Sequence, residues 1–256
     1  MSNPVAISVV IITYNEERNI ERCIQSVEGL ADEVLVVDSF SKDRSAEIAE
    51  RMGARVLQHE FEGHIEQKNW AVSQSRNIYI LSLDADEMID KNLCEEILKI
   101  KNNWFADGYV FNRLNNYCGK WLKHGGWYPD KKLRLWDSRK GKWTGKNPHD
   151  EYVMEEGAAI KHIQGNILHY SFNSIQEHMQ QVNYFTDLSA RAYYHKGRKA
   201  SLADVLIRTH WKFFRDYFIR LGFMDGYYGL IVCLISSFAT FLKYLKLREL
   251  YKKGGT

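Results

Sequence analysis

The stretch IYILSLDADE, residues 78–87, decides the fold of this chain. Its first six residues form an apolar run of strand length, and the carboxylates Asp84, Asp86 and Glu87 follow at once. A strand that ends in this way delivers negative charge to one point, where a hard divalent cation with oxygen ligands is the usual partner. Asp-x-Asp also occurs by chance in surface turns, so the rest of the chain has to decide between a metal site and a turn.

Strands and helices alternate along the first part of the chain. The runs that predict strands are 6–12, 33–38, 55–58 and 78–83, and the predicted helices are 16–27, from Ser41 or Asp43 to 52, and 66–75. Single helices between strands are typical of a parallel sheet with right-handed crossovers. Such a sheet binds its ligands beyond the carboxyl ends of the strands, which makes the residues at those ends the first candidates for a site.

Three of the predicted strands end in polar residues. They are Thr13, Tyr14, Asn15 and Glu16 after the first strand, Asp38, Ser39 and Ser41 after the second, and Asp84 and Asp86 after the fourth. Helix capping accounts for Asn15, Ser41 and Asp43, but it does not account for Asp38 or Asp86. No glycine-rich loop follows any of these strands, which argues against a dinucleotide enzyme and a P-loop NTPase. Metal and side chains would therefore have to hold any bound phosphate.

Four segments, taken together in their order and spacing, resemble family 2 glycosyltransferases of the GT-A fold. They are VVIITYNE (9–16), VVDS (36–39) with Asp43, QKNWA (67–71) and LDADE (83–87). The resemblance implies an α/β fold with a GT-A-type, Rossmann-like mixed sheet flanked by helices. We expect residues 1–172 to form this nucleotide-sugar-binding and catalytic domain, and 173–256 to form a helical extension. That extension resembles bacterial enzymes that add sugars to the lipopolysaccharide core or related envelope glycans.

The resemblance also implies a set of binding residues. Those expected at the nucleotide-sugar donor are Thr13, Tyr14, Asn15, Glu16, Asp38, Lys68, Asp84 and Arg134. A magnesium or manganese ion is expected at Asp86 and Asp84, and His169 resembles a position that completes the metal shell in some enzymes of this fold. Two alternatives stay open: Lys68 can be a solvated helix lysine, and His169 can be a buried histidine bonded to the backbone.

The chemistry of sugar transfer fits this inventory. Breaking a glycosyl-phosphate bond develops negative charge on the leaving diphosphate, which a divalent cation stabilises, and the acceptor hydroxyl needs a general base. The segment His149-Asp150-Glu151 supplies candidates for the base. Related enzymes show a histidine followed by a glutamate, so Asp150 matches by position and Glu151 by residue type. We favour Asp150, and the alternative is a local His-Asp hydrogen bond without chemistry.

The end of the chain is basic and aromatic. From Arg198 onward eleven Lys and Arg stand against four Asp and Glu, a net +7, whereas the remainder of the chain has a net charge of −4. Capping patterns at Ser174 and Ser201 predict helices from about 175 and 202. Residues 205–221 have the composition of a basic amphipathic helix, and the apolar run 227–242 is shorter than the roughly 20 residues of a bilayer span.

These features predict contact with an anionic membrane surface through residues 202–253. The run 227–242 can lie in the interface, enter the bilayer partway, or pack against the preceding helix, and the competing interpretation is a buried helix at a dimer interface. Nucleic acid is not expected as a partner, because no nucleic-acid motif is present and most of the chain is net acidic.

The sequence therefore predicts an inverting, hexosyltransferase-like, metal-assisted enzyme that moves a sugar from a nucleotide-sugar donor to a lipid-linked or lipopolysaccharide-core acceptor. We expect it in the cytoplasm, peripheral on the inner face of the bacterial cytoplasmic membrane, because no secretory signal is evident and the four cysteines are widely scattered. One alternative is a sugar-phosphate nucleotidyltransferase, whose glycine-rich loop is missing here. The other is a non-catalytic, nucleotide-sugar-binding membrane adaptor, against which the retained His149-Asp150-Glu151 argues.

Overall fold

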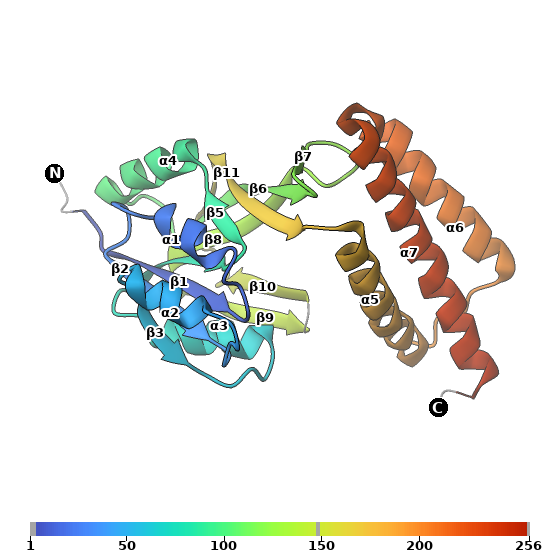
Figure 1. The fold of residues 1–256 in the computed structure, drawn as a ribbon, viewed down its shortest axis with the longest axis horizontal. Coiled ribbons are helices and arrows are strands. Elements are labelled where there is room, and N and C mark those ends of the chain that lie inside the picture. The colour runs from blue at the N-terminus through green and yellow to red at the C-terminus, as the bar shows by residue number, and fades with distance from the viewer. Residues whose placement is uncertain (1–3, 147–148, 255–256) are drawn as a thin grey trace. The chain divides into compact units, whose positions relative to one another are not determined.

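The computed structural model describes residues 4–146 and 149–254, which form two compact units (Figure 1). The first unit consists of residues 4–113 and 130–169, and the second of 114–129 and 170–254. The two units therefore differ from the two predicted sequence segments, because 114–129 is grouped with the C-terminal helices rather than with the sheet.

A parallel half-sheet forms one side of the first unit. Its strands, in spatial order, are β3 (Arg55–Gln58), β2 (Glu33–Asp38), β1 (Ile7–Thr13) and β4 (Tyr79–Asp84). All three neighbouring pairs are parallel, as the alternation of strands and helices predicts. The register pairs Thr13 with Asp38 and Ile12 with Asp84, so the polar ends of β1, β2 and β4 lie at one edge of the sheet.

Antiparallel strands continue the sheet beyond β4. In spatial order they are β8 (Asp130–Asp137), β6 (Gly108–Tyr117), β11 (Ile160–Phe172) and β5 (Glu87–Ile89), with β7 (Lys120–Leu122) paired to β6. A short 3-10 turn, Ser138–Lys140, leads from β8 into a separate hairpin of β9 (Gly141–Lys146) and β10 (His149–Met154). The predicted mixed α/β sheet is thus confirmed.

Helices and the hairpin cover the two faces of the sheet. On one face, Val9 and Ile11 pack in a cluster with α1 (Ile20–Gln25), α2 (Ser45–Arg51) and α4 (Lys91–Asn102). The alternate residue, Val10, packs on the other face with α3 (His64–Ser73) and the hairpin. Burial on both faces explains why the parallel strands read as continuous apolar runs rather than as alternating ones.

The hairpin is fastened to the sheet by aromatic rings. Tyr152 of β10 stacks on Trp136 of β8 with ring centroids 3.8 Å apart, and Trp143 of β9 meets Trp136 edge to face at 5.6 Å. Packed aromatic pairs of this kind stabilise by about 0.5–1.5 kcal/mol beyond their buried area. The segment 149–151 is part of this hairpin, at the start of β10.

The predicted starts of two helices are wrong. Asn15 does not cap α1, which begins at Ile20; it adopts a left-handed conformation with φ 55°. Its N–H donates to Ser41 Oγ at 2.8 Å, and its Oδ1 accepts from the N–H of Lys42 at 2.8 Å. The loops after β1 and β2 are thus tied to each other, and α2 begins only at Ser45. Side chains that look like helix caps here serve this loop contact instead.

The second unit is built from long helices. They are α5 (Ile175–His195), α6 (Leu202–Phe214) and α7 (Gly226–Lys252), with a π-helical turn Arg215–Ile219 and a 3-10 turn Gly222–Asp225 between the last two. Ser174 and Ser201 cap α5 and α6 as predicted, and Ser201 forms a complete capping box with Asp204. The buried core of this unit consists of Tyr117, Leu122, Phe172, Val232 and Cys233.

The apolar run 227–242 belongs to a longer helix than the sequence analysis expected. The helical stretch Gly222–Lys252 is, by length and composition, long and apolar enough to cross a membrane, and only 28% of its most apolar window is buried. Two polar contacts join α7 to the other helices of the unit. Ser237 Oγ donates to the Thr209 carbonyl of α6 at 2.8 Å, and Lys246 Nζ lies 2.9 Å from Asp187 of α5.

We predict that Gly165→Ala destabilises the first unit by about 2–5 kcal/mol. Gly165 has φ +111°, and a Cβ there would lie 2.7 Å from backbone atoms of Leu93 in the first turn of α4. The substitution therefore combines the cost of a positive φ with that of overpacking. Urea denaturation measures the effect. Gly157→Ala is the matched control, because Gly157 also has a positive φ but nothing within 4 Å of a Cβ, so only about 1–2 kcal/mol is expected. Equal losses in the two variants would contradict the packing argument.

Candidate active site

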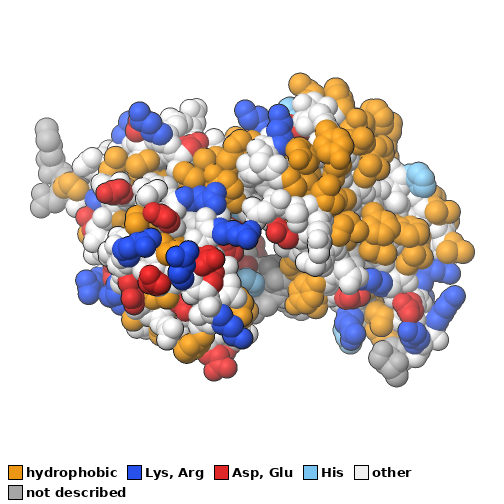
Figure 2. Space-filling model, viewed as in Figure 1, with side chains coloured by type: hydrophobic (Ala, Val, Ile, Leu, Met, Phe, Trp, Pro, Cys, Tyr) orange, Lys and Arg blue, Asp and Glu red, His pale blue; other side chains and the backbone are white. Residues whose placement is uncertain are grey.

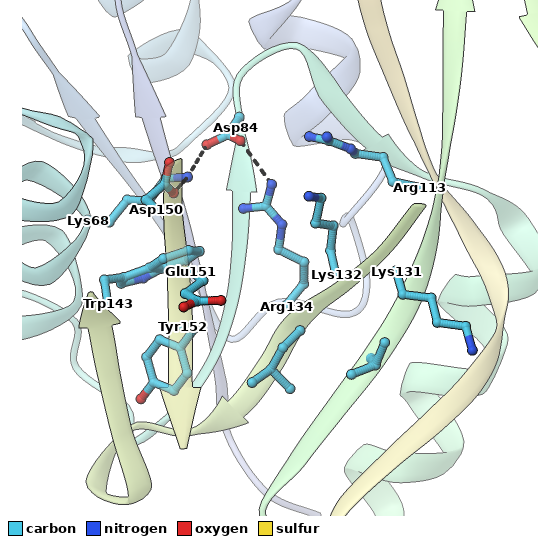
Figure 3. Close-up of a pocket in the computed structure, with 12 residues that line it drawn as sticks. Lys68, Asp84, Arg113, Lys131, Lys132, Arg134, Trp143, Asp150, Glu151 and Tyr152 are labelled. Carbon is cyan, nitrogen blue, oxygen red and sulfur yellow. Dashed lines mark hydrogen bonds and ion pairs between the residues drawn. The ribbon is translucent and has the colours of Figure 1, made fainter. Parts of the chain in front are cut away.

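A cavity of about 770 Å³ opens in the first unit and collects five of the predicted site residues (Figure 3). Those five are Lys68, Asp84, Arg134, Asp150 and Glu151. They come from α3, β4, β8 and β10, so the fold brings together side chains that are up to 83 positions apart in the sequence. The volume is in the range of small-molecule binding sites.

Lys68 lies at the centre of this group. Its side chain is only 5% exposed, and Nζ lies 3.0 Å from Asp84 Oδ1 and 2.8 Å from Asp150 Oδ2. The amine also stands 4.5 Å from the centre of the Trp143 ring. The alternative of a solvated helix lysine is therefore wrong, and Lys68 links the Asp-x-Asp segment to the candidate base.

Arg134 holds the other side of Asp84. Its Nη2 lies 2.9 Å from Asp84 Oδ2 and 2.8 Å from Glu87 Oε1, and the side chain is buried. Burial would lower the pKa of the guanidinium, but the carboxylates of Glu87 and Asp84 raise it above its ordinary value. Conversely, burial would raise the pKa of Asp84, whereas Lys68 and Arg134 hold that pKa well below its ordinary value.

Two nitrogens of Arg134 have no partner among the described residues. Nε and Nη1 are buried, and neither has a hydrogen-bond partner in the part of the chain that the structure describes. A buried guanidinium N–H without a partner costs free energy that an anionic ligand can recover. This is the clearest sign that the cavity receives an anion.

The ion pairs of the site form one chain of alternating charge. In order, its members are Asp150, Lys68, Asp84, Arg134, Glu87, Arg113 and Asp130. Glu87 also accepts the N–H of Asp84 at 3.0 Å, and Arg113 Nη2 lies 2.7 Å from Asp130 Oδ2. Each buried charge is thus compensated on two sides, which fixes the geometry of the strand end.

Asp86 and His169 lie together but do not line this cavity. His169 Nε2 lies 3.2 Å from Asp86 Oδ2, because the pairing of β11 with β5 places His169 opposite Glu87. Glu16 interacts electrostatically with Asp86. Burial raises the pKa of Glu16, and the carboxylates of Asp86 and Asp43 raise this pKa further. An acidic region with one histidine therefore adjoins the end of β4.

These residues fit a divalent cation only in part. In residues 4–146 and 149–254 no group of three or more His, Cys, Asp or Glu side chains is placed to hold a metal ion. Both oxygens of Asp84 already face cations, whereas Asp86 and His169 offer an oxygen and a nitrogen donor. Magnesium is commonly held by one or two carboxylates and completed by substrate phosphates, and Asp86 fits that use.

The ends of β1 and β2 present buried oxygens. Thr13 and Asp38 are paired in the register, and both are buried. Asp38 Oδ2 accepts the N–H of Ser41 at 3.0 Å, but Asp38 Oδ1 and Thr13 Oγ1 are buried without a partner among the described residues. Tyr14, next in the chain, is 55% exposed. Two acceptors of this kind are suited to N–H or O–H groups of a ligand.

The candidate bases lie on β10, where Asp150 pairs with Gly145 and Glu151 with Thr144 of β9. Both carboxylates line the cavity (Figure 3). Asp150 is held by Lys68, whereas Glu151 is exposed. The side chain of His149 lies outside the described part of the chain.

Sequence reasoning missed several residues of the site. Arg113, Lys131, Lys132, Trp143 and Tyr152 also line the cavity. A signal was present for Arg113, because an arginine inside a strand of mostly buried residues needs a carboxylate partner. In Figure 3 the side chains of Arg113 and Lys132 extend toward the ion pairs, and Lys131 extends away from them.

Comparisons with known proteins identify the family of the chain. The family model "Glycosyl transferase family 2" matches residues 8–154. An uncharacterized glycosyltransferase of Rickettsia bellii is 33% identical over 257 residues, which cover 95% of this chain and 86% of the relative. The lipopolysaccharide core biosynthesis glycosyltransferase LpsC of Rhizobium meliloti is 26% identical, over 95% of this chain and 92% of the relative.

Among solved structures, the S. aureus protein TarS (1–349) aligns with a TM-score of 0.48 and 14% identity, over 97% of this chain and 92% of that one. The family match covers more than half of the chain, and its boundaries enclose the ends of β1, β2 and β4, Lys68 and both candidate bases. The expected family is confirmed: this chain belongs to glycosyltransferase family 2 and is a glycosyltransferase.

Proposed function

We propose that the chain transfers a sugar, with inversion, from a nucleotide-sugar donor to a hydroxyl group of a lipid-linked or lipopolysaccharide-core acceptor. The observation that carries this proposal is the position of Lys68, which joins Asp84 of the donor side to Asp150 across one cavity. The name of the relative LpsC supports an acceptor of the lipopolysaccharide core. The catalytic domain in this proposal is 1–172, and 173–256 is the membrane-associating extension.

The donor would be bound in two parts. Thr13, Tyr14, Asn15, Glu16 and Asp38 would hold the nucleoside, and the support for this is the pair of unpartnered oxygens, Thr13 Oγ1 and Asp38 Oδ1. Lys68 and Arg134 would hold the diphosphate, which supplies acceptors for the unused Nε and Nη1 of Arg134. Positive charge placed in advance at the leaving group lowers the barrier to its departure.

A magnesium or manganese ion would be held by Asp86, with His169 and Asp84 as further candidate ligands. When bound, such an ion neutralises negative charge that develops on the diphosphate oxygens. The residues of this chain perform the remaining tasks: they orient the donor, neutralise the leaving group and remove a proton from the acceptor.

The base would be Asp150, with Glu151 as the alternative. A carboxylate takes the proton of the acceptor hydroxyl while that oxygen attacks the anomeric carbon, and the bond to the diphosphate breaks on the opposite face. Lys68 fixes Asp150 at 2.8 Å before reaction, so the carboxylate is positioned without loss of side-chain freedom at that step.

The partner on the lipid side would be an anionic membrane surface, contacted through residues 202–253. The net +7 of the end of the chain and the long apolar α7 support this. We accordingly propose a peripheral position on the inner face of the bacterial cytoplasmic membrane, and no role for nucleic acid.

We expect nucleotide diphosphate release from at least one donor in a panel of nucleotide sugars, stimulated by an envelope lipid extract. The assay includes magnesium or manganese, and chelation or Asp86→Ala is expected to reduce the rate by at least about 100-fold, as loss of a charge-stabilising group does. Lys91→Ala, a change in the first turn of α4, is the control variant. No release from any donor would overturn transfer, whereas pyrophosphate formed from a nucleoside triphosphate and a sugar phosphate would indicate a nucleotidyltransferase. Donor binding without turnover would indicate an adaptor.

We expect Asp150→Asn to lower kcat by about 10²–10⁴-fold with little change in donor KM, because a general base contributes to the chemical step. Glu151→Gln is the matched variant and is expected to stay within about tenfold of the unmodified enzyme, because that carboxylate is not the base. Single-turnover kinetics with saturating donor measure the step directly. The reverse ranking of the two variants would assign the base to Glu151.

A further inference from the structure

The turn that joins α6 to α7 exposes an unusual number of large apolar side chains. Six of them, Phe214, Phe218, Ile219, Phe223, Met224 and Tyr227, are between 47% and 69% exposed. Figure 2 shows hydrophobic side chains gathered over the second unit at the end where α6 meets α7. We call these six residues the apolar tip. An exposed patch of this kind marks a surface that binds a partner or a membrane.

A cluster of positive charge stands within the same turn. The buried carboxylate of Asp216, 1% exposed, has Lys212 Nζ at 2.5 Å, Arg215 Nε at 2.8 Å and Arg220 Nη1 at 3.5 Å. Three cations around one carboxylate leave a net charge of +2. Their side chains remain 30–47% exposed. The carboxylate holds the cations in place, which is how a phosphate-binding cluster is pre-organised.

The apolar tip and the three cations together distinguish a membrane from a protein partner. The core of a protein interface is depleted of charged residues, whereas three exposed cations belong to the same turn as the apolar tip. A lipid leaflet suits both kinds of side chain. Aromatic rings enter the boundary of the acyl chains, and long basic side chains extend back to the lipid phosphates. The charge also has the sign that anionic headgroups require.

The rest of the unit limits how deeply it can enter. The bonds of Ser237 to α6 and of Lys246 to α5 keep α7 within the helical unit, and the charged side chains of Lys212, Arg215 and Arg220 belong to the same turn as the tip. A shallow position in the interface satisfies both the apolar rings and these charges, while a full crossing by α7 breaks the helix contacts.

We propose that the apolar tip inserts into the headgroup and upper acyl region of an anionic leaflet, and that Lys212, Arg215 and Arg220 bind a lipid headgroup phosphate there. This inference rests on the proposed membrane partner and specifies which part of residues 202–253 makes the contact. It assigns the lipid site to the α6–α7 turn rather than to the basic C-terminal end of α7.

Vesicle co-sedimentation of the full chain tests this, with phosphatidylcholine vesicles alone or containing phosphatidylglycerol. Phe218→Glu is expected to lower binding to the anionic vesicles by more than about tenfold, since an apolar anchor is lost. Phe105→Glu, at a phenylalanine of the first unit that is 54% exposed, is the matched control and is expected to change binding by less than about twofold.

A second pair of variants tests the phosphate cluster. Arg215→Gln with Arg220→Gln is expected to lose the preference for phosphatidylglycerol by more than about tenfold, whereas Lys252→Gln with Lys253→Gln, an equal change in charge, is expected to retain most of it. Equal losses in the two double variants would overturn the assignment to the tip. If the chain dimerises, Phe218→Glu abolishes the dimer and no vesicle binding is seen, the tip is a protein interface.

Failure of this inference can be told apart from failure of the proposed function. Nucleotide diphosphate release from donor in the absence of vesicles is expected to be the same in the unmodified chain, Phe218→Glu and the arginine double variant. The same readout shows that the variants are folded. If the unmodified chain binds anionic vesicles but releases no nucleotide, the proposed reaction fails while the lipid site stands.

Discussion

The pairing of the buried guanidinium of Arg134 with the carboxylates of Glu87 and Asp84 is the constraint on which the site depends. An isolated buried charge costs several kcal/mol, so none of the three side chains can be buried without the others. Glu87 also accepts the N–H of Asp84, which fixes the turn between β4 and β5. The end of β4, the start of β5 and the middle of β8 are therefore held together by charge as well as by sheet pairing.

This pairing also sets the electrostatics of the cavity. Because Asp84 is flanked by Lys68 and Arg134, the first carboxylate of the Asp-x-Asp segment is already neutralised, whereas Asp86 is paired with His169. The two aspartates, one residue apart, thus have different environments. In the proposed reaction they have different tasks: Asp84 orders the cations that meet the diphosphate, and Asp86 is the carboxylate left for a metal ion.

The sequence predicted the parallel strands to within one residue at each end, and β2 and β3 with the same bounds, because continuous apolar runs are a strong local signal. The predicted starts of the helices after β1 and β2 were wrong, because Asn15 and Ser41 join the two loops instead of capping the helices. The Asn15 N–H donates to Ser41 Oγ, 26 positions away in the sequence. The family motifs located Asp84, Lys68 and Asp150, but the partners of Glu87 could not be predicted. Arg113 and Arg134 reach it from strands 26 and 47 positions away, and no local pattern reports such a pairing.

The unpartnered oxygens at the ends of β1 and β2 have a thermodynamic consequence. Thr13 Oγ1 and Asp38 Oδ1 are buried without hydrogen bonds from the described residues, so the ligand-free fold carries their desolvation cost. In the proposed function, a nucleotide that donates hydrogen bonds to both oxygens offsets this cost. Such a nucleotide would raise the melting temperature more than a ligand that leaves the two oxygens without donors. Under the proposed function, the melting temperature would therefore rank nucleosides by how well their hydrogen-bond donors match Thr13 Oγ1 and Asp38 Oδ1.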